Sequence, residues 1–179
     1  NPFHNGHYYQ IEQIRNLSQR PFLIAIISGY FCQRGEPAII SPRIRTKIAL
    51  ENGIDLVIQM PTYSSVGSAE IFASVAAAIL DRTGVCSNLA FGAEQNCLRE
   101  LEQIAQLLVE QENELWIYID QKLKLGIPYA KAREQFVAEK INPKTAALLQ
   151  QSNQILAIEY LKAIYKNSLN LKPWLIQRQ

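Results

Sequence analysis

The stretch Phe22-Leu23-Ile24-Ala25-Ile26-Ile27 is a continuous apolar run, with Pro21 before it and Ser28-Gly29 after it. Such a run is typical of a β-strand that is buried on both faces, like the central strand of a parallel sheet. Ligands of open α/β sheets bind at the carboxyl ends of such strands. A ligand is therefore expected next to the residues that follow Ile27.

Helix-like and strand-like segments alternate around this run, which predicts an α/β fold with a parallel sheet. Before the run, apolar residues at every third position predict a helix over 7–18. After it, Ser41-Pro42 is a helix start and Asn52-Gly53 a helix end. The further expected segments are a strand at 56–58, a deeply buried helix at 67–82, a strand at 89–91 and a helix at 98–108.

The alternation stops after residue 112. The part that follows is predicted to consist of helical pieces interrupted by glycine and proline, and a helix and a strand then resume the pattern near the end. The sequence thus predicts three parts: an α/β core at 1–112, a helical insertion or subdomain at 113–150 and a return to the core at 151–179.

Composition limits the class of protein. The chain has 179 residues, 48% of them hydrophobic, and a net charge of +2, which suits one ordinary core of a globular protein. The longest nearly uncharged stretch, 61–80, contains Glu70 and five Ser/Thr, so no membrane span is expected. Three cysteines without a C-x-x-C pair favour a reducing cytoplasm. The chain has no starting Met and is expected to be trimmed, at both ends.

Both histidines of the chain lie in His4-Asn5-Gly6-His7, directly before the first predicted helix. The free N–H groups and the positive dipole end of a helix start attract phosphate, and a glycine lets the backbone approach a ligand. Two imidazoles there would stabilise the charge of a transferring phosphoryl group. The alternative is a loop with two incidental histidines, but their pairing favours a catalytic role for His4 and His7.

A second polar block, Gln33-Arg34-Gly35-Glu36-Pro37-Ala38, follows the central strand at its carboxyl end. Arg34 is therefore expected to face the substrate. The alternative is an exposed ion pair between Arg34 and Glu36, which would contribute little.

Several motifs together make the chain resemble a known family. The tetrad resembles the H-x-G-H signature of the nucleotidyltransferase superfamily, whose members bind ATP on a Rossmann-like sheet. With its other motifs the chain is similar, over almost its whole length, to the tRNA(Met) cytidine acetate ligases. These motifs are Asn1 to His7, Ser28-Gly29, Gln33 to Ala38, Arg45-Thr46-Lys47, Ala49 to Gly53, Phe91-Gly92 and Ser152-Asn153.

The resemblance implies an ATP-dependent ligase that activates acetate as acetyl-adenylate and acetylates N4 of the wobble cytidine of elongator methionine tRNA, with Mg²⁺ assisting. No protein ligand for the metal is visible in the sequence. The chain departs from the family pattern at Gln10, Tyr30 and Gln59, which leaves another acyl acceptor open. The nucleotide contacts that the resemblance implies are Asn1, Pro2, Phe3, His4, Asn5, Gly6, His7, Tyr8, Tyr9, Gln10, Gly92, Asn153, Arg178 and Gln179.

The predicted helical insertion is a candidate RNA-binding surface. Residues 122–144 carry six basic and two acidic residues, in a chain whose total charge is only +2. Clustered positive charge suits RNA backbone phosphates, so Lys131 and Arg133 are predicted to contact tRNA. A solvated helix face is the alternative interpretation.

Two other functions stay open from the sequence alone. One is a nucleotidyltransferase that forms an adenylate or cytidylate with a small acceptor. The other is a module that binds nucleotide or RNA without turnover. Exchange of diphosphate into ATP, with and without acetate, distinguishes the three.

Overall fold

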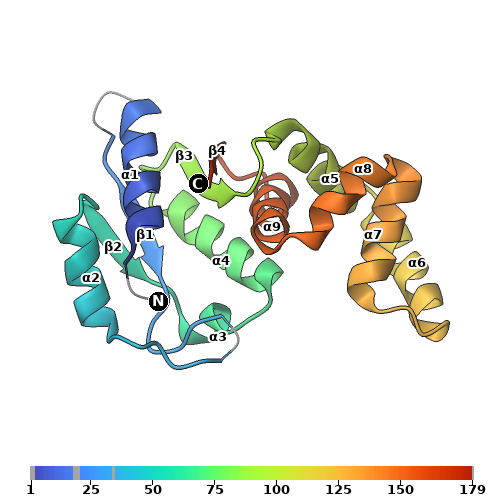
Figure 1. The fold of residues 1–179 in the computed structure, drawn as a ribbon, viewed down its shortest axis with the longest axis horizontal. Coiled ribbons are helices and arrows are strands. Elements are labelled where there is room, and N and C mark those ends of the chain that lie inside the picture. Colours follow the sequence, from blue (N-terminus) through green and yellow to red (C-terminus); the bar gives the residue numbers. More distant parts are fainter. Residues whose placement is uncertain (1–2, 18–20, 34, 179) are drawn as a thin grey trace.

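A computed structural model describes residues 3–17, 21–33 and 35–178 as a mixed α/β fold (Figure 1). Its four strands form two parallel pairs. β1 (Ile24–Ile27) lies beside β2 (Leu56–Gln59), with Ile24 opposite Leu56. β3 (Asn88–Ala93) lies beside β4 (Lys172–Gln177), with Asn88 opposite Lys172.

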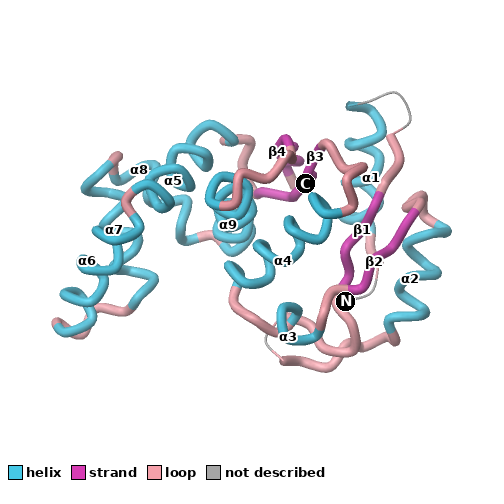
Figure 2. Tube along the Cα trace, turned by 180° about the vertical axis from the view of Figure 1, so that it is seen from behind, coloured by secondary structure: helices cyan, strands magenta, loops and turns pink. Residues whose placement is uncertain are grey.

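Helices connect and cover these pairs. In Figures 1 and 2, α4 lies between the β1–β2 pair and α9, and α9 packs against both α4 and α5. The helices are α1 (Asn5–Leu17), α2 (Pro42–Glu51), α3 (Thr62–Ser65), α4 (Ala69–Arg82), α5 (Leu98–Glu110), α6 (Glu112–Lys124), α7 (Tyr129–Lys140), α8 (Pro143–Ala146), a 3-10 turn (Ala147–Gln150) and α9 (Ser152–Lys166).

The composition of the run at 22–27 predicts a strand that is buried on both faces, and this prediction is wrong. All four residues of β1 are half-buried, and Phe22, which precedes the strand, is 69% exposed. Within the described residues β1 pairs with β2 only, so the strand lies at an edge of its sheet rather than at its centre. Ile24 and Ile26 still pack against the core, so the strand buries one face better than the other.

Local signals place the helix ends. Ser41 accepts a hydrogen bond from the N–H of Ile44 at the start of α2, as expected for a Ser-Pro start. At the end of α2, the N–H of Ile54 donates to Ala49 and that of Gly53 to Leu50, a Schellman motif with Gly53 at φ +99°. Gly126 ends α6 in the same way, at φ +78°.

The predicted helix at 67–82 begins later and is less buried than expected. Ser68 caps α4, and only one face of the helix is fully buried, through Ala73, Ala76, Ala77 and Leu80. Ile71, on the opposite face, is 45% exposed. Although the sequence of α4 is apolar on all sides, only one side of this helix packs against the core.

One apolar core runs through most of the described chain. It joins Phe91 of β3 and Ile158 of α9 to Phe136 of α7. The helices from α6 to the 3-10 turn thus share this core, while extending to one end of the molecule (Figure 1). The division into parts at residues 112 and 150 stays a prediction. None of the described helices is long and apolar enough to cross a membrane.

Candidate functional site

The tetrad forms the first turn of α1. The carbonyl oxygen of His4 accepts the N–H of His7 at 2.8 Å, and the two imidazole rings lie 3.9 Å apart between centroids. Nδ1 of His4 accepts the N–H of Gly6 at 3.1 Å, and Nδ1 of His7 accepts the N–H of His4 at 3.3 Å. A nitrogen that accepts carries no proton, so each neutral ring holds its proton on Nε2. Both Nε2–H groups are therefore donors, as a phosphate oxygen requires.

Gly6 has a packing role that the sequence analysis did not foresee. A Cβ at this position would lie 3.0 Å from Cε1 and 3.1 Å from Nδ1 of the His4 ring. A larger residue here would push the ring away from the helix start by a few tenths of an ångström. The prediction that Gly6 lets a ligand approach the backbone stays untested.

His7 is held in its neutral form. Desolvation by surrounding atoms, followed by the electrostatic effects of His4 and Arg178, lowers its pKa to about 4, although the residue keeps contact with solvent. Phe3 contributes to this crowding, since its ring centroid lies 5.4 Å from that of His7. At neutral pH, His7 is thus a hydrogen-bond donor rather than a cation.

Arg178 comes to the tetrad from the end of β4. Its N–H donates to the carbonyl oxygen of Ala93 at 2.8 Å, which extends the β3–β4 pairing by one residue. Its Cγ and Cδ atoms lie 3.5 and 3.6 Å from where a Cβ of Gly92 would be. The structure thus brings the predicted residues Gly92 and Arg178 together, and the coulombic effect of Arg178 on the pKa of His7 links them to the tetrad.

Asn153 lies in the first turn of α9 and is paired with Glu94, a residue that the sequence analysis missed. One oxygen of Glu94, Oε1, accepts from Nδ2 of Asn153 at 2.8 Å and from its N–H at 3.3 Å. Glu94 follows β3 directly, so its signal was available: an acidic residue two positions after Gly92, at the carboxyl end of a strand.

The loop after β1 is held by Arg45 and does not offer that arginine to a ligand. Nη2 of Arg45 donates to the carbonyl oxygens of Ser28, at 2.8 Å, and of Gly29, while Nε donates to Ile40 at 3.2 Å. The hydroxyl of Ser65 donates to the carbonyl oxygen of Phe31 at 2.7 Å and ties α3 to the same loop.

The other predicted site residues are distributed as follows. Asn5 and Tyr8 are exposed on α1, whereas Tyr9 and Gln10 are half-buried there. Asn1, Pro2, Arg34 and Gln179 lie outside the described residues, so their predicted roles stay predictions.

Among residues 3–17, 21–33 and 35–178, no group of three or more His, Cys, Asp or Glu side chains is placed to hold a metal ion.

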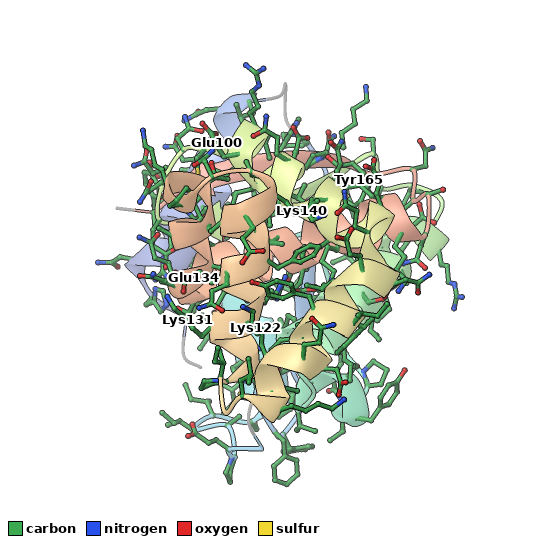
Figure 3. All side chains as sticks on the ribbon, turned by 90° about the vertical axis from the view of Figure 1, so that its right-hand side faces the viewer. Glu100, Lys122, Lys131, Glu134, Lys140 and Tyr165 are labelled. Carbon is green, nitrogen blue, oxygen red and sulfur yellow. The ribbon has the colours of Figure 1, made fainter. Side chains whose placement is uncertain are left out.

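The two predicted RNA contacts differ in their surroundings. Lys131 is on the surface of α7 and lies beside Glu134, with 3.0 Å between Nζ and Oε1 (Figure 3). Arg133 is only 8% exposed, and its Nη2 is 2.7 Å from Oε1 of Glu159. An Arg133 contact with RNA would compete with this buried ion pair, and both RNA contacts stay predictions.

Comparisons with known proteins identify the family of the chain. The model of the HIGH Nucleotidyl Transferase family matches residues 1–179. A tRNA(Met) cytidine acetate ligase of Acetivibrio thermocellus is 41% identical over 182 residues, which cover 99% of this chain and 43% of that protein. A ligase of the same name from Thermoanaerobacter sp. strain X514 is 42% identical over 180 residues, covering 100% of this chain and 45% of that protein.

A solved structure matches equally well. The crystal structure of Thermotoga maritima TmcAL bound with alpha-thio ATP has a TM-score of 0.92 and 37% identity, and the match covers 99% of this chain and 44% of that one. The chain therefore spans less than half the length of the relatives it matches. The α/β nucleotidyltransferase class predicted from the sequence is confirmed, and the chain belongs to the HIGH nucleotidyl transferase family, within which it is similar over its whole length to the tRNA(Met) cytidine acetate ligases.

Proposed function

We propose that the protein activates acetate with ATP and transfers the acetyl group to N4 of the wobble cytidine of elongator methionine tRNA. The observation that carries the proposal is the pair of Nε2–H donors, on His4 and His7, at one helix start, with Arg178 acting electrostatically on His7. Phosphate oxygens accept from such donors. The match to an ATP-analogue complex of TmcAL supports the same ligand.

The proposed reaction has two steps. In the first, an acetate oxygen attacks the α-phosphorus of ATP, the bond to the β-phosphate breaks, and diphosphate leaves. In the second, N4 of the cytidine attacks the acetyl carbon of acetyl-adenylate; AMP leaves and the amine loses a proton. His4 and His7 stabilise the charge on the transferring phosphoryl group, and Arg178 neutralises charge on the phosphates.

Mg²⁺ is part of the proposal only as a partner of ATP. It supplies charge neutralisation on the phosphates. Since the described residues contain no metal-binding cluster, the ion would be held by phosphate oxygens and water, and no step here is assigned to it. Arg34 stays a predicted catalytic residue in the loop after β1. We also place the reaction in the cytoplasm, where tRNA is modified.

The test is exchange of labelled diphosphate into ATP, measured with and without acetate. Exchange that depends on acetate supports the ligase function. Exchange that requires a different small acceptor identifies a nucleotidyltransferase of another specificity, and ATP binding without any exchange identifies a binding module. Acetylation of cytidine in added methionine tRNA then tests the second step separately.

A further inference from the structure

The junction between the β3–α5 loop and α9 holds the side chain of Asn153 in one orientation. Glu94 Oε1 accepts from both the Nδ2 and the backbone N–H of Asn153, at 2.8 and 3.3 Å. With Nδ2 directed at a carboxylate, the amide cannot turn over without losing a charge-assisted hydrogen bond. Asn153 therefore presents its oxygen, an acceptor, away from Glu94.

A second side-chain pair fixes the same junction. Nε2 of Gln154, whose side chain is fully buried, donates to Sγ of Cys97 at 3.4 Å. Cys97 precedes α5, and Gln154 follows Asn153 in the first turn of α9. Residues 94–97 are thus linked to the start of α9 at two points, which makes the junction a rigid support.

The junction is rich in acceptors that have no donor. Among the described residues, three buried oxygen atoms here lack a hydrogen-bond partner: Oε2 of Glu94, Oε1 of Gln151 and Oε1 of Gln154. All three are acceptors; the Gln154 side chain is completely buried and out of reach of a bound molecule, whereas Glu94 and Gln151 are half-buried. Buried polar atoms in native proteins are normally paired, so a molecule that binds here is expected to supply hydrogen-bond donors.

The position of the junction indicates which molecule that is. Gly92 lies two positions before Glu94, near the carboxyl end of β3, and the side chain of Arg178, which follows β4, lies beside Gly92. Arg178 also acts electrostatically on His7. The phosphates of a nucleotide are acceptors and suit the histidine and arginine donors. The donors of the same nucleotide lie at its other end, on the ribose hydroxyls and the adenine amino group.

We propose that Glu94 is a positioning residue for the nucleoside half of ATP: it orients the amide of Asn153 and offers its own Oε2 to a hydroxyl or amino donor of the nucleoside. This inference rests on the proposed function, because it takes ATP as the ligand. It assigns to Glu94 a role in distinguishing nucleotides by their donors, which a purely structural carboxylate would not have.

The test replaces Glu94 by Gln and measures the binding of four nucleotides. The amide keeps the shape of the side chain, but it removes the charge and puts an N–H₂ group where an acceptor stood. Loss of such a bond in a polar site weakens affinity by about tenfold or more. We expect Glu94→Gln to weaken the binding of ATP about tenfold. The other three nucleotides, 2′-deoxy-ATP, 3′-deoxy-ATP and ITP, each lack one donor, and the variant should weaken much less the binding of the one that lacks the donor bound by Glu94.

The matched control is Glu100→Gln, the same change on an exposed carboxylate in the first turn of α5. Its nucleotide affinities are expected to equal those of the wild type, and thermal unfolding of both variants checks the fold. The inference is overturned if Glu94→Gln binds all four nucleotides as the wild type does, or weakens all four equally, while the wild type catalyses acetate-dependent exchange. If the wild type binds no ATP, the proposed function fails, and this inference fails with it.

Discussion

At the scale of single residues, the histidine pair is defined by its hydrogen bonds. Each Nδ1 accepts a backbone N–H, so each Nε2–H is available to a ligand. We expect His4→Ala and His7→Ala each to reduce acetate-dependent exchange by about two to three orders of magnitude, as the loss of one preorganised donor does.

Glutamine provides the matched variant for this prediction. Its Nε2 group donates from nearly the same place as Nε2–H of histidine, so His7→Gln is expected to retain more activity than His7→Ala. Both variants should unfold close to the wild-type temperature, because His7 is exposed and contributes no core packing. Exchange at wild-type rate in either alanine variant contradicts the assignment.

The lowered pKa of His7 gives a second prediction at this scale. In the folded protein the ring gains its proton only near pH 4, whereas in the unfolded chain it does so near 6.5. The unfolded state thus binds more protons between these values, so His7 makes the protein less stable as pH falls from about 6.5 to 4. His7→Gln should flatten the pH dependence of the free energy of unfolding in this window.

Ligand binding should move the same pKa upward. A diphosphate or ATP placed beside His7 adds negative charge, which favours the protonated ring. NMR titration of the His7 ring, with and without diphosphate, measures the shift. A titration midpoint that is unchanged at saturating diphosphate would show that the anion binds elsewhere.

Three features of the site show what could and could not be predicted from the sequence. The tetrad was identifiable because both histidines of the chain fall within four positions, beside a helix start. The role of Gly6 was not, because it depends on how the His4 ring folds back. The position of Glu94 after β3 was a local signal for this residue, but its pairing with Asn153, 59 positions away, leaves no local pattern.

At the scale of elements, local chemistry predicts boundaries and distant pairing decides burial. Ser41-Pro42, Asn52-Gly53 and Gly126 mark ends of α2 and α6 correctly, since caps involve neighbouring residues only. The apolar run at 22–27 predicts a strand but cannot say how many edges of it are paired. Its incomplete burial depends on which segments pack on its two faces, and these come from distant parts of the chain.

The ion pairs that connect α7, α9 and α4 give a prediction about stability at the scale of elements. Arg133 contacts Glu159, and Lys162 bridges Glu159 and Glu70 of α4, at 2.8 and 3.0 Å. Arg133→Met leaves a buried carboxylate with only one cationic partner. We expect the free energy of unfolding to fall by roughly 3 kcal/mol.

Lys131→Met is the control on the same helix. Lys131 pairs with Glu134 at the surface, where an ion pair contributes less than about 1 kcal/mol. Denaturant unfolding of the two variants compares them directly. Equal stability losses would mean that the Arg133 pair is no more important than a surface contact.

At the scale of the whole molecule, the two ends differ in character. The proposed nucleotide site lies among the strand ends, and the α6–α7 pair extends away from that part of the molecule (Figure 1). The positive charge predicted for that pair is largely balanced, because Lys124, Lys131 and Lys140 each contact an acidic side chain. Their partners, Asp120, Glu134 and Glu114, all belong to α6 or α7. The charge count over residues 122–144 includes only Glu134 of these three, so it overstates the positive charge.

The turn between α6 and α7 gathers three lysines, two of which, Lys124 and Lys131, have acidic partners just outside it. Residues 121–131 include three lysines and no acidic residue. Beside them, the rings of Trp116 and Tyr129 lie 6.1 Å apart and are 51% and 41% exposed. Exposed aromatic rings with lysines are the features by which proteins bind unpaired RNA bases and the backbone around them.

If this turn contacts tRNA, replacing Lys124 and Lys131 together by Gln should weaken tRNA binding and leave ATP binding intact. Each lost phosphate contact lowers the slope of log affinity against log salt by about 0.7 to 0.9, so the double variant should lose about 1.4 to 1.8. The matched control replaces Lys166 and Lys172, which are exposed on α9 and β4, by Gln. A titration of tRNA at several salt concentrations compares the slopes. A double variant whose slope equals that of the control would assign the two lysines to a solvated helix surface, because their intramolecular partners Asp120 and Glu134 would then be all that they bind.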